Sequence, residues 1–203
     1  MEVNTNTEQT VIEEQIVEEM EAPKKEKKSP KEELKEWIRD LGMALIIGLI
    51  IITFIKPTIV KEHSMEPTLE ENNYIFLSKQ AYTLFGEPER GDIVVFHSDL
   101  RTVDDKEKLL VKRIIGLPGD TVMITGGVVY INGVPLDEPY TKDGYTNTEL
   151  EEVTVPEGHV FAMGDNRQNS IDSRHSDVGC VSIDQVVGKA VLRLYPFDQI
   201  TLF

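Results

Sequence analysis

Residues 41–55 form an uninterrupted apolar run, LGMALIIGLIIITFI, with no charged side chain. Ten of these fifteen residues are Leu, Ile or Phe, so a helix of this sequence has no polar face. Fifteen helical residues rise only about 22 Å, and crossing a hydrocarbon core of ~30 Å requires the helix to extend toward Trp37 and Val60. A buried core helix and a cleaved secretory signal have similar compositions. We favour an uncleaved membrane anchor at residues 37–57, because the small residues needed for signal cleavage do not follow the run.

The charges on either side of this run are unevenly distributed. Residues 1–23 carry seven Glu and no Lys or Arg, whereas residues 24–39 carry seven Lys or Arg and four Glu. The positive-inside rule therefore places the N-terminus in the cytoplasm and residues 58–203 outside it. Because residues 1–36 have few large apolar side chains, we expect them to form a disordered, charged cytoplasmic tail.

Charge and cysteine content exclude several classes of function. The formal net charge of −15 argues against a general affinity for nucleic acid. The single cysteine, Cys180, excludes an intramolecular disulfide framework and any CxxC metal or redox motif. The four histidines do not have the spacing of zinc ligands, and the GxSxG motif of many triad hydrolases is absent. We therefore expect neither a metal nor an organic cofactor.

The remainder of the chain, residues 58–203, has the pattern of a β domain. Turn signals separate short runs of β-branched and aromatic residues, and Asn132-Gly133 predicts a type I′ hairpin that Pro135 weakens. The fold class predicted is mainly β, an antiparallel barrel or sandwich behind one transmembrane helix. The strands expected are residues 74–77, 93–96, 109–115, 121–124, 128–131, 160–163 and 189–195.

One lysine in these strands has an unusual setting. Alternation along a strand puts Lys112 on the same face as Leu110 and Ile114. If that face is interior, desolvation disfavours the ammonium and makes the lysine a candidate general base for a serine nucleophile. The alternative is a lysine at the edge of a sheet, with its charge in water. The strand pattern alone does not decide between the two.

Four motifs, in order behind the anchor, resemble bacterial type I signal peptidases. They are SMEPTL at residues 64–69, RGDIVVF at 90–96, KRIIGLPGD at 112–120 and GDNRQNSIDSR at 164–174. The resemblance extends over about residues 37–200, including GKAV at 188–191. Each motif is weak alone, but their order and spacing together are specific. The resemblance implies the β fold of signal peptidases and repressor-like proteases.

The resemblance also implies roles for individual residues. Ser64 corresponds to the nucleophile, Lys112 to the general base, and Ser170 to the hydroxyl that orients the lysine amine. By the same matching, four charged residues support this loop without catalytic roles. They are Asp165, Arg167, Asp172 and Arg174.

The implied activity is that of a membrane-bound serine endopeptidase that removes signal peptides from exported preproteins. Many family members have Ser or Thr two positions before the nucleophile as an oxyanion donor, but this chain has Glu62, which we interpret as a mark of the Gram-positive type. Shallow apolar pockets would select small substrate residues. The lining residues expected are Val60, Met65, Leu110 and Val111.

These expectations define a single-pass protein of the cytoplasmic membrane, monomeric, with signal peptides and the lipid bilayer as its partners. Two alternatives stay open. A self-cleaving, repressor-like protease would share the Ser-Lys dyad, although the apolar anchor argues against it. A membrane-tethered β domain that binds exported chains without cleaving them would not need Ser64 and Lys112.

Overall fold

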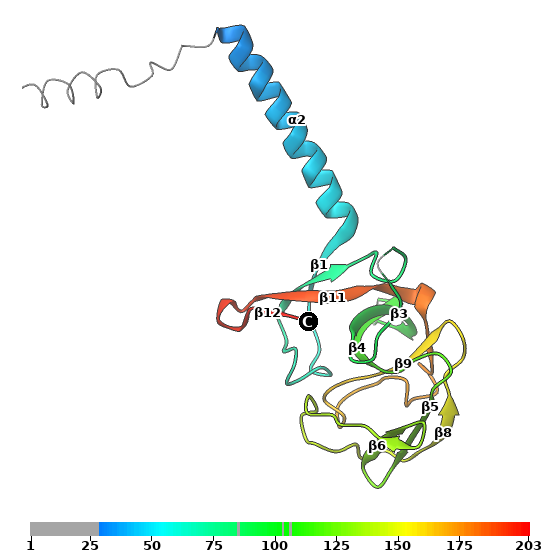
Figure 1. Cartoon of the computed structure of the whole chain (residues 1–203). Coiled ribbons are helices and arrows are strands. Elements are labelled where there is room, and N and C mark those ends of the chain that lie inside the picture. The colour runs from blue at the N-terminus through cyan, green and yellow to red at the C-terminus, as the bar shows by residue number, and fades with distance from the viewer. Residues whose placement is uncertain (1–28, 85, 103, 106) are drawn as a thin grey trace, which may run out of the picture. The chain divides into compact units, whose positions relative to one another are not determined.

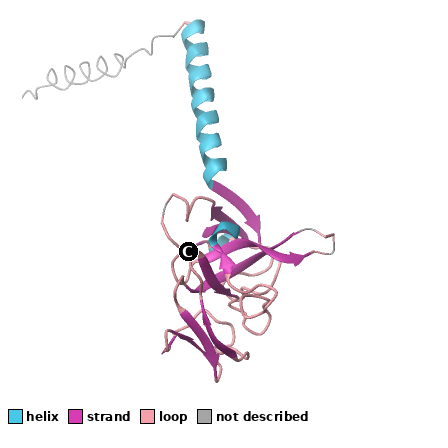
Figure 2. Cartoon of the chain, turned by 90° about the vertical axis from the view of Figure 1, so that its right-hand side faces the viewer, coloured by secondary structure: helices cyan, strands magenta, loops and turns pink. Residues whose placement is uncertain are grey.

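The computed structural model describes residues 29–203 except 85, 103 and 106. The disorder expected for residues 1–28 therefore falls outside the described residues. The chain divides into two compact units, residues 1–47 and 48–203, with the division inside one long helix. Figure 1 shows this helix in blue to cyan, and Figure 2 shows that strands and loops make up nearly all of the rest.

The helix, α2 (Pro30–Phe54), begins earlier than the sequence analysis predicted. Ser29 and Glu32 form reciprocal contacts at its start: the Glu32 N–H donates to Ser29 Oγ at 3.4 Å, and the Ser29 N–H donates to Glu32 Oε2 at 2.9 Å. Pro30 occupies the first helical turn, where its missing N–H costs no hydrogen bond. The expectation that the whole of 1–36 is disordered is therefore wrong for residues 30–36.

The apolar part of α2 is not the core helix of a globular domain. None of its 25 residues is buried, and Leu45 and Ile52 are 63% and 64% exposed. Its length and its mean hydropathy of 1.9 over the most apolar window fit a membrane span. The helix ends at Phe54 instead of residue 57, because residues 55–57 enter a strand and Pro57 cannot continue a helix.

All strand pairs are antiparallel and form two sheets. The larger sheet has the order β1-β2-β11-β3-β4-β9-β10, with β12 beside β11, and the smaller has the order β7-β6-β5-β8. The mainly β, antiparallel fold predicted from the sequence is confirmed. The remaining elements are β1 (Ile55–Ile59), β2 (Tyr74–Ser78), β3 (Ile93–Arg101), β4 (Glu107–Gly116), β5 (Thr121–Thr125), β6 (Val128–Ile131), β7 (Val134–Pro135), β8 (Leu150–Thr154), β9 (His159–Met163), β10 (Val181–Ser182), η1 (Ile183–Gln185), β11 (Val186–Tyr195), η2 (Phe197–Gln199) and β12 (Thr201–Leu202).

The expected hairpin forms at Asn132-Gly133. Both residues have positive φ, 53° and 76°, as a type I′ turn requires, and Ile131 pairs with Val134 across it. All seven predicted strands are present. Strands β1, β8, β10 and β12 were not predicted, because two of them are only two residues long, β8 is rich in Glu, and β1 was assigned to the anchor.

The larger sheet is covered on both faces where β3 and β4 pair. One core cluster includes Met65, Leu69 and Val95, and another includes Val94, Leu110 and Ile114. Neighbouring residues of β3 thus enter different clusters, as the alternation of side chains along a strand requires. The middle of β4 is therefore surrounded by apolar side chains, and a charged residue there loses its contact with water.

Candidate active site

Ser64 lies in the segment that connects β1 to β2. Hydrogen bonds between Val60 and Asn73 (N to O, 2.9 Å) and between Asn72 and Val60 (N to O, 2.8 Å) close this segment into a compact loop. Met65 follows Ser64 and is 1% exposed in the core, so the loop is anchored next to the hydroxyl. Burial of the Met65 side chain therefore holds Ser64 in place.

Lys112 lies in the middle of β4, paired with Val94 of β3. It is 1% exposed and shares its strand face with the buried residues Leu110 and Ile114. This burial excludes the alternative of a solvated lysine at a sheet edge, because β4 is flanked by β3 and β9. The amine Nζ donates to the carbonyl of Val111 at 3.0 Å.

The Nζ of Lys112 is 2.7 Å from the Oγ of Ser64. Burial lowers the pKa of Lys112 from its usual 10.5 to about 8, while Asp172 and Glu62 partly oppose this shift. Lys112 has no salt bridge to a carboxylate within the described chain. A pKa of about 8 leaves about a tenth of the amine neutral at pH 7, so a group that can accept a proton is in hydrogen-bond contact with a hydroxyl.

The loop after β9 contributes Asp172, a fully buried carboxylate. It accepts hydrogen bonds from the Gly164 N–H at 2.9 Å, the Ser170 hydroxyl at 2.6 Å and the Arg174 guanidinium at 2.8 Å. Burial by itself would raise the pKa of Asp172, but Arg174 and the other hydrogen bonds outweigh it and hold that pKa below its usual value. Asp172 therefore stays ionised and organises the loop.

Ser170 does not contact the lysine amine as the resemblance implied. Its hydroxyl donates to Asp172, and the amine of Lys112 is bonded to Ser64 and Val111 in the part of the chain that the structure describes. Ser170 is nevertheless close to the nucleophile: a Cβ placed on Gly164 would be 2.4 Å from both Ser170 Oγ and the Ser64 carbonyl oxygen. Glycine at position 164 thus permits the close approach of the two loops.

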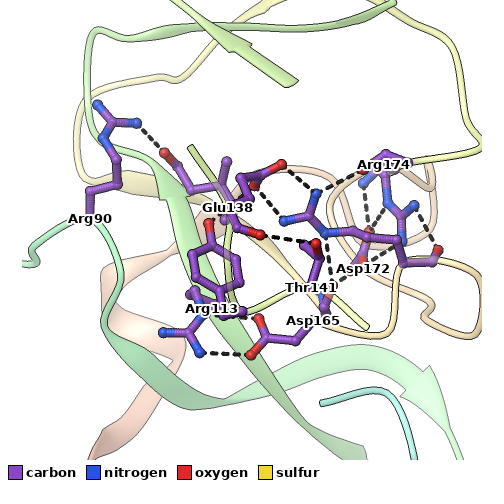
Figure 3. A network of polar contacts seen from close by, with 12 residues as sticks. Arg90, Arg113, Glu138, Thr141, Asp165, Asp172 and Arg174 are labelled. Atoms are coloured by element: carbon purple, nitrogen blue, oxygen red, sulfur yellow. Dashed lines mark hydrogen bonds and ion pairs between the residues drawn. The ribbon is translucent and has the colours of Figure 1, made fainter. Parts of the chain in front are cut away.

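Asp165 pairs with Arg113, the residue after Lys112, and not with the neighbouring Arg167. The Arg113 guanidinium donates to Asp165 through Nε at 2.9 Å and Nη2 at 2.7 Å, and Thr68 Oγ1 donates to the same carboxylate at 2.6 Å. Figure 3 shows Arg113 facing Asp165. This bidentate pair joins β4, the Ser64 segment and the loop after β9.

Arg167 is 2% exposed and pairs with Glu138, at 2.5 Å from Nη2 to Oε1, and with the Thr146 hydroxyl at 2.8 Å. Arg174 donates through Nη1 to the Arg167 carbonyl at 2.9 Å. Figure 3 shows Glu138, Asp172 and Arg174 within one network of polar contacts. The four charged residues that the resemblance assigned to loop support do therefore make structural contacts, with partners that the sequence did not reveal.

A cleft of about 740 Å³ opens beside Ser64. Of the four expected lining residues, Val60, Met65 and Val111 line it. Leu110 does not, because alternation along β4 turns it into the core cluster with Val94 and Phe96. The lining also includes residues that the sequence analysis did not name, among them Ile59, Tyr74, Val95, Lys108 and Leu109.

Two further residues of the site were missed in the sequence. Asn166 donates its N–H to the Ser64 carbonyl and its side-chain amide to the His63 carbonyl, each at 3.0 Å. Glu138 lies in a loop between β7 and β8 with no distinctive local pattern. Asn166 and Arg113 do stand inside the recognised motifs, so position in a motif was the available signal.

Comparison with known proteins gives consistent matches. The family model for signal peptidase, peptidase S26, matches residues 34–195. A signal peptidase I from Bacillus licheniformis is 37% identical over 180 residues, covering 84% of this chain and 93% of that protein. A probable signal peptidase I-1 from Synechocystis is 39% identical over 175 residues, covering 84% and 87% of the two chains.

A crystal structure of a signal peptidase I from Enterococcus faecalis is 35% identical, with coverage of 51% of this chain and 96% of that chain and a TM-score of 0.41. The family match spans all but the first residues of α2, the Ser64 segment, β4 and the loop after β9. On these matches, the chain belongs to the signal peptidase family, peptidase S26.

Proposed function

We propose that this protein cleaves signal peptides from exported preproteins, with Ser64 as the nucleophile and Lys112 as the general base. The observation that carries the proposal is the 2.7 Å contact between Ser64 Oγ and a lysine amine that is 1% exposed and has a pKa of about 8. A neutral amine at this distance accepts the hydroxyl proton as Oγ attacks a peptide carbonyl. Membership of the signal peptidase family supports the choice of substrate.

The reaction proceeds in two acyl-transfer steps. Oγ bonds to the carbonyl carbon, and the Ser64 proton moves to Lys112. The ammonium then protonates the leaving amine as the peptide bond breaks, which produces an ester with Ser64. A water molecule gives a proton to the neutral lysine and attacks the ester carbonyl. The bond between the carbonyl carbon and Oγ then breaks, the lysine ammonium returns the proton to Ser64 Oγ, and the new carboxyl end of the peptide is released.

The main-chain N–H of Ser64 is one donor for the developing oxyanion. It makes no hydrogen bond to another residue in the described part of the chain, so it is available to a substrate. Glu62 forms an ion pair with Lys108 at 2.5 Å and has no hydroxyl to donate. The family serine or threonine at this position is therefore not replaced by an equivalent donor.

Specificity for small residues would follow from the walls of the cleft. Val60, Met65 and Val111 present apolar side chains on rigid backbone next to Ser64. A large substrate side chain would have to displace the core packing of Met65, whereas alanine would not. The preferred cleavage site is then small-x-small, as expected from the resemblance.

The anchor helix determines where the enzyme acts. Seven Lys or Arg in residues 24–39 support an N-terminus in the cytoplasm and residues 58–203 on the outer side of the cytoplasmic membrane. An anchored enzyme and a substrate held by its signal sequence meet in two dimensions, which raises their effective concentration. We expect the enzyme to be monomeric in the lipid bilayer.

Cleavage of a preprotein by the full chain in detergent tests the proposal. The wild type should cut after a small-x-small site, and Ser64→Ala should abolish the cut while leaving the β domain folded by circular dichroism. Asn169→Ala, in the loop after β9 and without a proposed role, is the control and should retain activity. Cleavage that persists in Ser64→Ala would refute the nucleophile assignment, and a folded wild type that never cleaves would favour the binding-only alternative.

A further inference from the structure

An ion pair lies at the mouth of the cleft, next to the dyad. Glu62 Oε1 and Lys108 Nζ are 2.5 Å apart, and their side chains are 46% and 30% exposed. Both residues line the cleft that Ser64 also lines. At this exposure the pair contributes little to folding stability, so its position relative to the dyad is the more informative property.

The pair connects the two segments that carry the dyad. Glu62 is two residues before Ser64, and Lys108 is four residues before Lys112 on β4. The backbone of Lys108 is held in place because its carbonyl accepts a hydrogen bond from Ser98 Oγ at 2.7 Å.

Four charged groups act on the buried amine of Lys112 besides its burial. Asp172 and Arg174 come from the loop after β9, and Glu62 and Lys108 come from the ion pair. The carboxylates raise the pKa of the amine and the cations lower it. Each carboxylate is therefore paired with a cation that opposes its effect: Arg174 bonds to Asp172 at 2.8 Å, and Lys108 bonds to Glu62.

We propose that Glu62 and Lys108 are positioning residues for the Ser64–Lys112 dyad, acting as a balanced pair of opposite charges at the mouth of the cleft. The proposal rests on the proposed function and assigns a use to the residue that replaces the family serine or threonine. Without Lys108, the carboxylate of Glu62 would raise the pKa of Lys112 and favour its protonated form. Lys108 offsets part of that charge, so that burial, the largest cause, still keeps the pKa of Lys112 at about 8.

This arrangement predicts opposite effects for two single substitutions. Glu62→Gln removes a negative charge, which makes Lys112 easier to deprotonate and moves the rising limb of kcat/KM to lower pH. Lys108→Gln leaves the carboxylate unopposed and moves the limb to higher pH. A shift of about half a pH unit in either direction is about a threefold gain or loss in kcat/KM on the limb. The double variant should have its midpoint between those of the two singles.

A second ion pair in the same region provides matched controls. Glu66 is two residues after Ser64 and bonds to Lys142 at 2.7 Å. Neither residue lines the cleft as described, and neither acts on the amine of Lys112. Glu66→Gln and Lys142→Gln therefore remove the same kinds of charge, Glu66→Gln at the same spacing from Ser64 as Glu62, and they should leave the midpoint of the pH profile unchanged.

The experiment measures kcat/KM for a preprotein from pH 6 to 10, using the full chain in detergent micelles. Midpoints that shift in opposite directions for Glu62→Gln and Lys108→Gln, with unmoved controls, support the proposal. Equal losses in both variants at every pH, with an unmoved midpoint, indicate only structural support and overturn it. A midpoint that shifts equally in the control variants also overturns it.

A measurement without substrate separates this inference from the proposed function. The ¹³Cε chemical shift of Lys112, assigned by its loss in Lys112→Met, reports the titration of the amine directly. If the wild type does not cleave but the two variants shift this titration in opposite directions, the proposed function is refuted. The proposal that Glu62 and Lys108 act on Lys112 is then still supported. If the wild type cleaves and the titration is the same in all variants, the charge pair fails alone.

Discussion

Lys112 and Arg113 are consecutive residues of β4 and are both buried or nearly so, yet they have opposite surroundings. Arg113 donates two hydrogen bonds to Asp165 and lies with its guanidinium 4.1 Å from the ring centre of Tyr140. The amine of Lys112 faces a serine hydroxyl and a carbonyl. A buried cation with a carboxylate partner keeps its charge and holds segments together, whereas one without a partner binds its proton more weakly. The comparison separates the dyad from its supporting network.

The largest effect should come from Lys112→Met, which removes the base and retains an apolar side chain of similar length. Cleavage should fall by about 10³-fold or more, because the hydroxyl has no group to accept its proton. Stability should be unchanged or higher, since a costly buried amine has been removed. Preprotein cleavage and urea unfolding measure the two quantities. Substantial cleavage, or a large loss of stability, would place Lys112 in the supporting network instead.

Arg113→Met should reduce mainly the stability of the fold, whereas Lys112→Met should reduce mainly cleavage. It leaves the fully buried Asp165 without its cation, which should cost about 3–5 kcal/mol of unfolding free energy. Chemical denaturation of the full chain in detergent measures this cost. The matched substitution Arg113→Lys keeps the charge but loses the second hydrogen bond, and it should recover part of the stability. A stable Arg113→Met protein would show that the Asp165 network is not structural.

The pH dependence of cleavage should show the titration of Lys112 directly. With a pKa of about 8, the neutral fraction rises about 100-fold from pH 6 to pH 9, and kcat/KM should rise with it. The pKa of Lys112 is lower in the folded chain than its usual 10.5, so the protonated amine lowers the free energy of unfolding. This destabilisation is complete below pH 8. It should disappear as the pH rises from 8 to 10.5. A flat activity profile between pH 6 and pH 9 would contradict the assignment.

Ser170→Ala should have the smallest effect of the four. Ser170 donates to Asp172, so its loss removes one of several hydrogen bonds to that carboxylate and should cost about 1 kcal/mol of stability. Activity should fall about tenfold or less if Ser170 acts only through Asp172. A fall in kcat comparable to that of Lys112→Met, with KM unchanged, would instead support the direct contact with the amine that the family resemblance implied.

Local patterns in the sequence were sufficient for many features. The apolar run, the alternation around Lys112 and the Asn-Gly turn depend on residues that are neighbours along a helix, strand or hairpin. The structure adds precise ends: the capping contacts of Ser29 start α2 at Pro30, and the pairing of Ile55–Ile59 with β2 ends it at Phe54. The prediction that Leu110 lines the cleft was wrong because it relied on proximity in sequence to Lys112. Such proximity does not indicate which face of β4 borders the cleft.

The amino-acid sequence by itself determined the anchor, the β character of the rest and the identity of the two residues that we propose react. Only the tertiary structure decided that Lys112 is dry and 2.7 Å from Ser64, and that Arg113 and Arg167 pair with Asp165 and Glu138. The physical reason is that strand patterns depend on nearest neighbours, whereas desolvation and ion pairing depend on groups 29 to 52 positions apart in the chain. Folding brings these groups together, and the surroundings that it creates determine their pKa values.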